Sequence, residues 1–422
     1  MSPPERDLSG LDLAEFIRPG DGLVWGQTAA EPAPLTATLV EQRHALGSLE
    51  AFIGATWSPV ADPTNADTIR FRSYCATAGN RRLAAAGHLE LLRHRYSGLG
   101  VLLRSGAIKA DVLLLQAAPD PVTGKPSLSL ASDYLVPALA RARACIVELN
   151  SQAPWTPGAR LIPEELLACV VRTSREPLRP PAAPPPSPIM RKVAQQVASL
   201  IDDGCTLQFG IGTLPEAVLA ELHDRRNLGI HSGAFGDEAA RLCRAGAVTN
   251  ALKARDAGVS VIGVVMGGAE ACAFVDRNPA VRFASTDYTH SARVLASIDG
   301  FTAINAAIEV DLTGQVNAEV AAGAQVGAVG GAPDFLLGAM RARRGRAIVA
   351  LPSTAGDGKP LVSRIVAHLA GPISTPRMSV GFVVTEHGVA DLRGASERQR
   401  RDRLVAIAAP EFRDSLRQAG RD

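Results

Sequence analysis

Short, uninterrupted apolar runs recur along this chain and constrain its fold more than any other feature. Residues 110–116 read ADVLLLQ and residues 144–150 read ACIVELN, so each run is apolar and ends in polar residues. Strands that are apolar on both faces are typical of parallel sheets with helices on both sides. The segment between them, 134–143, can form such a helix. The sequence therefore predicts an α/β fold with mainly parallel sheets.

The same pattern extends through both halves of the chain. Residues 23–25 form a strand-like run that leads through a turn to a helical segment at 35–43, and residues 189–202 have the pattern of an amphipathic helix. The remaining strands expected in the second half are 259–266, 347–351 and 381–385.

A proline-rich segment, EPLRPPAAPPPSP at residues 176–188, interrupts this pattern. Proline at this density excludes helix and central strand, and a chain of 422 residues exceeds the usual size of one core. The sequence predicts an N-terminal α/β domain at 1–175, a linker at 176–188 and a C-terminal α/β domain at 189–422.

Composition argues against several classes of protein. A net charge of +2 lacks the basic excess that binds a nucleic-acid backbone. The chain has no signal-peptide pattern and no run of roughly 20 apolar residues that would cross a membrane, so a cytoplasmic location is expected. Its six cysteines form no CxxC pair and no zinc-binding spacing with histidine. We expect no metal site and no permanently bound cofactor.

A glycine turn follows the apolar run that ends at Phe209. Gly210 and Gly212 precede a helix that Thr213 is expected to cap, with Glu216 completing a capping box. Backbone amides at such a turn can approach an anion or a thioester carbonyl, because glycine has no side chain in the way. A tight strand-to-helix turn with no ligand explains the same residues.

A second glycine-rich segment, GAQVGAVGGAPDF at residues 323–335, also precedes an expected helix. The amides of Gly330 and Gly331 are candidates for an oxyanion hole, which would stabilise a polarised thioester carbonyl. A flexible connection is the alternative interpretation.

Polar side chains at expected strand ends are candidate catalytic groups. Glu386 follows the apolar run 380–384, and Glu148 and Asn150 lie at the end of the run 144–150. Open α/β sheets bind ligands at the carboxyl ends of their strands, which favours a role in binding or catalysis. The alternative interpretation is that these polar side chains are ordinary surface residues. His231 is a further candidate, as a base that activates water. The serine after it would point to the opposite side of an extended segment, which argues against a Ser/His relay.

Several long segments of the chain together have a family pattern. They are DGCTLQFGIGTLPEAVLAEL, NLGIHSGAF, INAAIEVDLTGQVNAE, GAVGGAPDF, FVVTEHGVADLRG and APEFRDSL. These segments resemble the acetyl-CoA hydrolase/transferase family, of the 4-hydroxybutyrate CoA-transferase type, and the resemblance extends from about residue 20 to residue 416. It implies two α/β domains of the CoA-transferase fold that assemble as a homodimer or higher homo-oligomer.

The resemblance also implies a mechanism and a set of site residues. Family members transfer CoA through a covalent glutamyl thioester. Their segment resembles HTEMF, whereas this chain reads HSGAF, so Gly233 occupies the position of the nucleophilic glutamate. By the same alignment Glu386 resembles a glutamate that lines the CoA site. The candidate substrate-binding residues are Gln208, Gly210, Gly212, Gly330, Gly331, Gly388 and Asn150.

Three hypotheses about function follow. The first is hydrolysis of an acyl-CoA without a covalent intermediate, at the thioester or at a carbon–carbon bond of a β-keto acyl-CoA, with water activated by Glu386, Glu148 or His231. The second is CoA transfer to a small carboxylate through a displaced enzyme carboxylate, for which Asp237 and Glu238 are the nearest in sequence. The third is a non-catalytic CoA-binding protein.

Overall fold

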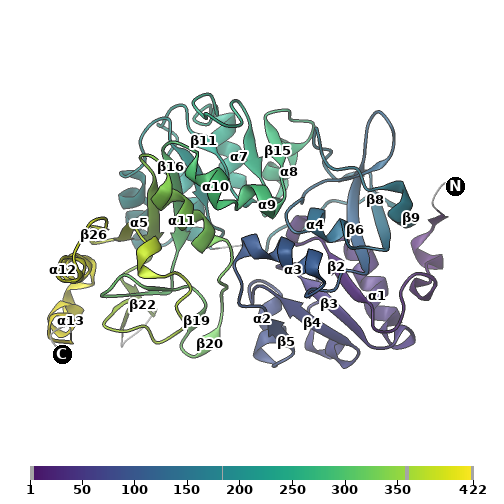
Figure 1. The fold of residues 1–422 in the computed structure, drawn as a ribbon, viewed down its shortest axis with the longest axis horizontal. Coiled ribbons are helices and arrows are strands. Elements are labelled where there is room, and N and C mark those ends of the chain that lie inside the picture. The colour runs from purple at the N-terminus through teal and green to yellow at the C-terminus, as the bar shows by residue number, and fades with distance from the viewer. Residues whose placement is uncertain (1–3, 183, 357–360, 420–422) are drawn as a thin grey trace. The chain divides into compact units, whose positions relative to one another are not determined.

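The computed structural model describes residues 4–182, 184–356 and 361–419, which form two compact units. The first unit contains residues 1–181, 234–237 and 261–289, and the second contains 182–233, 238–260 and 290–422. The units are therefore not contiguous in sequence, because two later segments belong to the first. Figure 1 traces the chain through both by colour. The contiguous domain boundaries expected from the sequence stay a prediction.

The first unit is built on one large sheet with the strand order β1-β9-β8-β6-β2-β3-β4-β5. All of these neighbours pair in parallel, and β7 pairs antiparallel with β6. The strands are β1 Glu5–Arg6, β2 Gly22–Trp25, β3 Leu49–Ile53, β4 Ile69–Ser73, β5 Leu89–Leu91, β6 Val112–Pro119, β7 Pro126–Leu128, β8 Ala144–Asn150 and β9 Leu167–Thr173.

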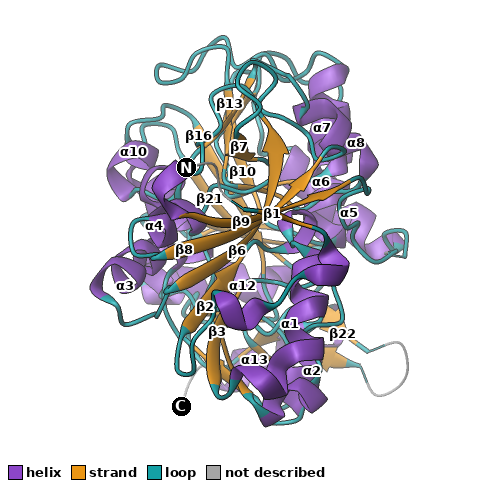
Figure 2. Ribbon diagram, turned by 90° about the vertical axis from the view of Figure 1, so that its right-hand side faces the viewer, coloured by secondary structure: helices purple, strands orange, loops and turns teal. Residues whose placement is uncertain are grey.

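Helices cover both faces of this sheet, as the apolar strands require. Figure 2 shows α3 and α4 on one side and α1 and α2 on the other. The helices are α1 Ala33–Leu46, α2 Asn80–Ala85, α3 Leu99–Ser105, α4 Leu135–Leu139, α8 Ala269–Val275 and α9 Thr286–Thr289. Short strands add two small pairs, β12 Ala234–Phe235 with β14 Val264–Val265, and β13 Ser260–Ile262 with β15 Val281–Phe283.

The second unit contains a smaller sheet with the order β11-β10-β16-β21-β25-β26, parallel except for the last pair. The strands are β10 Thr206–Phe209, β11 Gly229–Ile230, β16 Phe301–Ala306, β21 Arg346–Ala350, β25 Phe382–Thr385 and β26 Gly388–Asp391. The helices are α5 Pro188–Ala198, α6 Thr213–Ala220, α7 Asp237–Arg244, α10 Ala292–Ala296, α11 Ala332–Arg341, α12 Glu397–Ile407 and α13 Arg413–Ala419.

Short strands extend this second unit away from its sheet. They pair as β17 with β18 and β24, β19 with β20, and β22 with β23. Their bounds are β17 Glu309–Asp311, β18 Val316–Asn317, β19 Val320–Ala321, β20 Ala324–Gln325, β22 Thr354–Ala355, β23 Val362–Ser363 and β24 Ile365–Val366.

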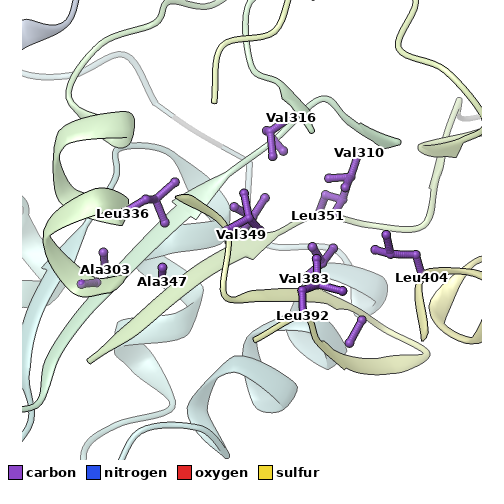
Figure 3. Close-up of a cluster of buried hydrophobic side chains, with 14 of the residues drawn as sticks. Ala303, Val310, Val316, Leu336, Ala347, Val349, Leu351, Val383, Leu392 and Leu404 are labelled. Carbon is purple, nitrogen blue, oxygen red and sulfur yellow. The ribbon is translucent and has the colours of Figure 1, made fainter. Parts of the chain in front are cut away.

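The core of the second unit lies where its sheet meets α11, α12 and these short strands. Ala303, Val349 and Val383 come from neighbouring strands of the sheet and pack with Leu336 of α11 and Leu404 of α12 (Figure 3). All five side chains are buried. Burial of aliphatic side chains from every layer holds the strands in register and fixes the ends of those strands in space.

The fold confirms the α/β class and most of the predicted strands, with three corrections. The run at 259–266 forms β13 and β14, because the chain bends between them instead of continuing as one strand. The helix expected at 134–143 is shorter, at Leu135–Leu139. The capping box is wrong: helix α6 begins at Thr213 itself, Gly212 occupies the N-cap without a side-chain bond, and Glu216 accepts a hydrogen bond from the Glu238 amide at 3.0 Å.

Candidate functional site

The carboxyl edge of the second sheet contains a point where the strand order reverses. From β10 the chain moves through α6 to β11, while from β16 it moves the other way to β21. Ligands of open α/β sheets bind in the crevice at such a point. Gln208 of β10 and Asn305 of β16 face each other across it, and their buried amides exchange hydrogen bonds of 3.3 and 2.9 Å. The predicted binding residue Gln208 therefore holds the two diverging strands together.

The glycine turn lies at this edge, directly after β10. The Gly210 amide donates to the Ile304 carbonyl at 2.9 Å, which continues the ladder to β16 for one more residue. Gly212 has a φ of +107°, a conformation that side chains disfavour, and the space in which its Cβ would stand is open. The turn thus presents exposed backbone at the crevice.

Gly233 lies close to an imidazole that sequence analysis did not single out. A Cβ at position 233 would stand 2.9 Å from Cε1 of His290 and 3.6 Å from the Phe335 ring. A Cβ at Gly331 would stand 2.5 Å from Nε2 of the same histidine. The His290 ring therefore fills the side-chain space of two of the predicted site glycines at once.

Aromatic packing fixes the position of this ring. The centroids of His290 and Phe335 are 4.3 Å apart, Phe335 is 6.4 Å from Phe301, and His231 meets Phe301 edge-on at 6.4 Å. His290 is 3% exposed. Burial, with a smaller contribution from His231, lowers the pKa of His290 to about 3, so the imidazole is neutral at physiological pH.

The acidic residues that follow Gly233 in sequence both have partners. The Asp237 carboxylate accepts hydrogen bonds from the amides of Gly268 and Ala271 at 2.8 to 3.0 Å, and so caps the start of α8. The Glu238 carboxylate is buried and pairs with His223 at 2.9 Å and with Arg241. Neither carboxylate can be displaced toward another role without breaking these contacts.

Glu386 follows β25 at the same edge of the sheet. Its carboxylate accepts hydrogen bonds from the Ser353 amide at 2.8 Å and the Ser353 hydroxyl at 2.6 Å. Strands β11 and β25 are four positions apart in the sheet order, so the ends that carry His231 and Glu386 are about 19 Å apart at a strand spacing of about 4.8 Å. The catalytic candidates at this edge therefore fall in two separate places.

The remaining glycines of the predicted site flank these places. Gly330 and Gly331 immediately precede α11, and Gly330 has a φ of +55°. Gly388 begins β26, opposite Thr385 in the hairpin that carries Glu386, and has a φ of +132°. Both positive φ values identify turns that require glycine.

Glu148 and Asn150 belong to the first unit. The buried Glu148 carboxylate accepts hydrogen bonds from Arg175 at 2.7 and 2.8 Å and from Thr173 at 2.8 Å. The Asn150 side chain bonds the backbone amide and carbonyl of Arg175. This ion pair and these amide contacts anchor the chain that leaves β9, which opposes a role for Glu148 as a proton acceptor.

The first unit also contains buried acids that sequence analysis missed. Burial raises the pKa of Glu31 to about 7, although its carboxylate accepts hydrogen bonds from Trp57 and Ser58. Burial likewise raises the pKa of Asp133 to about 6, where it accepts from Gln27 at 2.7 Å and from Tyr96 at 3.1 Å. The available signal for Glu31 was a glutamate in the turn between the strand-like run 23–25 and the helical segment 35–43.

No three His, Cys, Asp or Glu side chains within residues 4–182, 184–356 and 361–419 are grouped so that they could hold a metal ion. In those same ranges, every helix is too short or too polar to cross a membrane.

Parallel α/β sheets with glycine turns and polar side chains at their carboxyl edges define a class of proteins that bind small molecules at those edges. Comparison with known proteins specifies the family. The model of the acetyl-CoA hydrolase/transferase N-terminal domain matches residues 5–172, and that of the C-terminal domain matches residues 267–420. The 4-hydroxybutyrate coenzyme A transferase of Clostridium kluyveri is 38% identical over 319 residues, 75% of this chain and 73% of its own.

Solved structures agree with this assignment. RipA from Yersinia pestis superimposes with a TM-score of 0.91 at 30% identity, and 4-hydroxybutyrate CoA-transferase from Porphyromonas gingivalis with 0.81 at 30% identity. Each covers 99% of this chain and 97% of its own. The chain belongs to the acetyl-CoA hydrolase/transferase family, and it is an enzyme of the acyl-CoA hydrolase/transferase class.

Proposed function

We propose that this enzyme hydrolyses an acyl-CoA without forming a covalent glutamyl intermediate. The observation that carries the proposal is the surroundings of Gly233. The family segment that this part of the chain resembles has glutamate at that position. Glycine has no group that could attack a thioester. The His290 ring lies 2.9 Å from where a Cβ at that position would stand, so it occupies the start of the path that a glutamate side chain would take.

The contacts of nearby carboxylates support hydrolysis over transfer by a displaced nucleophile. Asp237 caps a helix, and Glu238 is held by a histidine and an arginine. A carboxylate that gives up such hydrogen bonds loses about 1.5–3 kcal/mol for each, which makes it a poor replacement nucleophile. Water requires no such rearrangement, and a CoA thioester then serves as the substrate with no permanently bound cofactor.

Two types of hydrolysis fit the proposal. Water can attack the thioester carbonyl directly, with backbone amides near Gly330 and Gly331 stabilising the oxyanion. Alternatively, water can cleave a carbon–carbon bond of a β-keto acyl-CoA, where the same donors stabilise an enolate. Both use the CoA site and differ in their products.

CoA transfer to a small carboxylate is the second candidate, and the names of the relatives favour it. The relative from Fasciola hepatica, 33% identical over 428 residues, is a succinyl-CoA:acetate/propanoyl-CoA:succinate CoA transferase. Transfer here would need another carboxylate, and Glu386 with its Ser353 contacts is the acid at the sheet edge.

Mass spectrometry of products separates these candidates. Purified enzyme is incubated with short, branched, aromatic and β-keto acyl-CoAs, each with and without acetate or succinate. Hydrolysis releases free CoA without an acceptor, and carbon–carbon cleavage gives a shortened acyl-CoA. A new acyl-CoA that forms only when the acceptor is present would establish transfer and refute the proposal, and no turnover of any substrate would favour a non-catalytic CoA-binding protein.

A further inference from the structure

Three residues that are far apart in sequence meet at the His290 ring. Gly233 follows β11, Gly331 is the N-cap of α11, and His290 precedes α10. The ring stands within 3.1 Å of the Cβ position of both glycines. Side chains at 233 and 331 are thus incompatible with the ring in this place, because contacts below about 3.5 Å are repulsive for carbon atoms.

The two glycines are partly exposed, whereas the ring behind them is buried. A substrate group that approaches the backbone at 233 and 331 meets the imidazole without an intervening side chain at either position. Phe335 fixes the plane of the ring by packing at 4.3 Å, and the buried His231 contributes a second imidazole nearby. The arrangement holds one polar ring against a partly exposed backbone surface.

We infer that His290 is a catalytic residue that accepts the proton of the water attacking the thioester, an inference that rests on the proposed hydrolysis. The water oxygen bonds to the carbonyl carbon, its proton passes to the imidazole, and the carbonyl oxygen becomes the oxyanion. When the carbon–sulfur bond breaks, the imidazolium returns that proton to the sulfur of the leaving CoA. The products are a carboxylic acid and the CoA thiol, and no oxidant or reductant takes part.

The position of His290 against Gly233 and Gly331 supports this role. Burial keeps the ring neutral, which is the form that accepts a proton, and it also makes the ring a weaker base than a histidine in water. The other candidate bases are less suited: Glu386 is held by both groups of Ser353, and Glu148 is paired with Arg175 in the first unit. Of the two neighbouring imidazoles, His231 and His290, the ring of His290 is the one that lies against Gly233 and Gly331, so His290 is the expected base.

The test compares His290→Ala and His290→Gln with the native enzyme on an acyl-CoA that the native enzyme hydrolyses. General base catalysis contributes on the order of 10²–10⁴-fold, so both variants are expected to lose at least about 100-fold in kcat. KM is expected to stay within about threefold, because the lost interaction forms in the transition state. Added imidazole is expected to restore part of the rate of the alanine variant only, since truncation leaves a space of the size of the ring.

The matched control is His94→Ala in the first unit, since His94 also packs against a glycine, with Cε1 1.9 Å from a Cβ at Gly98. This control should keep the native kcat. A glutamine variant with native kcat would overturn the inference, because it would show that His290 has only a packing role. Native turnover that requires a carboxylate acceptor, or no native turnover, would overturn the proposed hydrolysis and this inference with it. Native hydrolysis that survives both substitutions would overturn the inference alone.

Discussion

Substituting Gly233 by alanine tests the packing on which the account of the site depends. The new Cβ would stand 2.9 Å from Cε1 and 3.1 Å from Nε2 of His290, against about 3.5–4.0 Å for unstrained carbon contacts. The ring must therefore move by several tenths of an ångström within a buried aromatic cluster. Overpacking of this kind lowers the free energy of unfolding by about 1–3 kcal/mol.

A double-mutant cycle attributes that cost to the histidine. In a His290→Ala background the clash is removed, so Gly233→Ala is expected to cost less than about 0.5 kcal/mol, and the coupling energy of the pair is expected to be about 1–3 kcal/mol. Urea unfolding of the native protein, both single variants and the double variant measures all four corners. Gly10→Ala is the control, because a Cβ there meets nothing within 4 Å. Equal costs for Gly233→Ala in both backgrounds would refute the packing argument.

The remaining predictions concern stability. Glu148→Ala leaves the Arg175 guanidinium without its buried partner, so urea titrations should show a free energy of unfolding lower by about 3–5 kcal/mol. A loss below about 1 kcal/mol would contradict the ion pair described. Gly212→Ala places a side chain at a φ of +107° in open space and should cost about 1–3 kcal/mol from backbone strain alone, whereas unchanged thermal stability would contradict that conformation. Burial raises the pKa of Glu31 from its ordinary value of 4.5 to about 7 in the folded protein. The stability that the protonated Glu31 side chain contributes is therefore fully present below pH 4.5 and is lost as pH rises through 7. The free energy of unfolding of Glu31→Gln should therefore rise by up to about 3 kcal/mol relative to that of the native protein between pH 4.5 and 8. Urea titrations of both proteins across this range measure the difference, and a difference independent of pH would contradict the raised pKa.

Sequence patterns were sufficient to predict the strands and the glycine turns, because each of these depends on residues that are neighbours in sequence. The apolar runs at 112–115 and 145–147 are buried on both faces, so hydrophobicity alone identifies β6 and β8. Gly212 and Gly388 have positive φ values, which explains why glycine occurs at these two predicted site positions. Glu386 follows its strand, as the apolar run before it indicated.

The arrangement of the site could not be predicted from sequence patterns, since it depends on contacts between segments that are far apart along the chain. His290 is a lone histidine in sequence, and only the fold brings it against Gly233 and Gly331. The capping box failed because Glu216 bonds the amide of Glu238, a partner that propensity does not reveal. Glu148 had the local pattern of a catalytic acid, but its pairing with Arg175 depends on the path of the chain after β9.

A single-turnover reaction in ¹⁸O-labelled water, with excess enzyme over an acyl-CoA and no carboxylate acceptor, tests the central claim most directly. Mass spectrometry then reads both the released acid and the intact protein. Direct attack by water predicts ¹⁸O in the released acid from the first turnover and no acyl or CoA adduct on the protein. Unlabelled acid in the first turnover, together with a CoA adduct that hydroxylamine removes, would contradict the account and establish a covalent carboxylate.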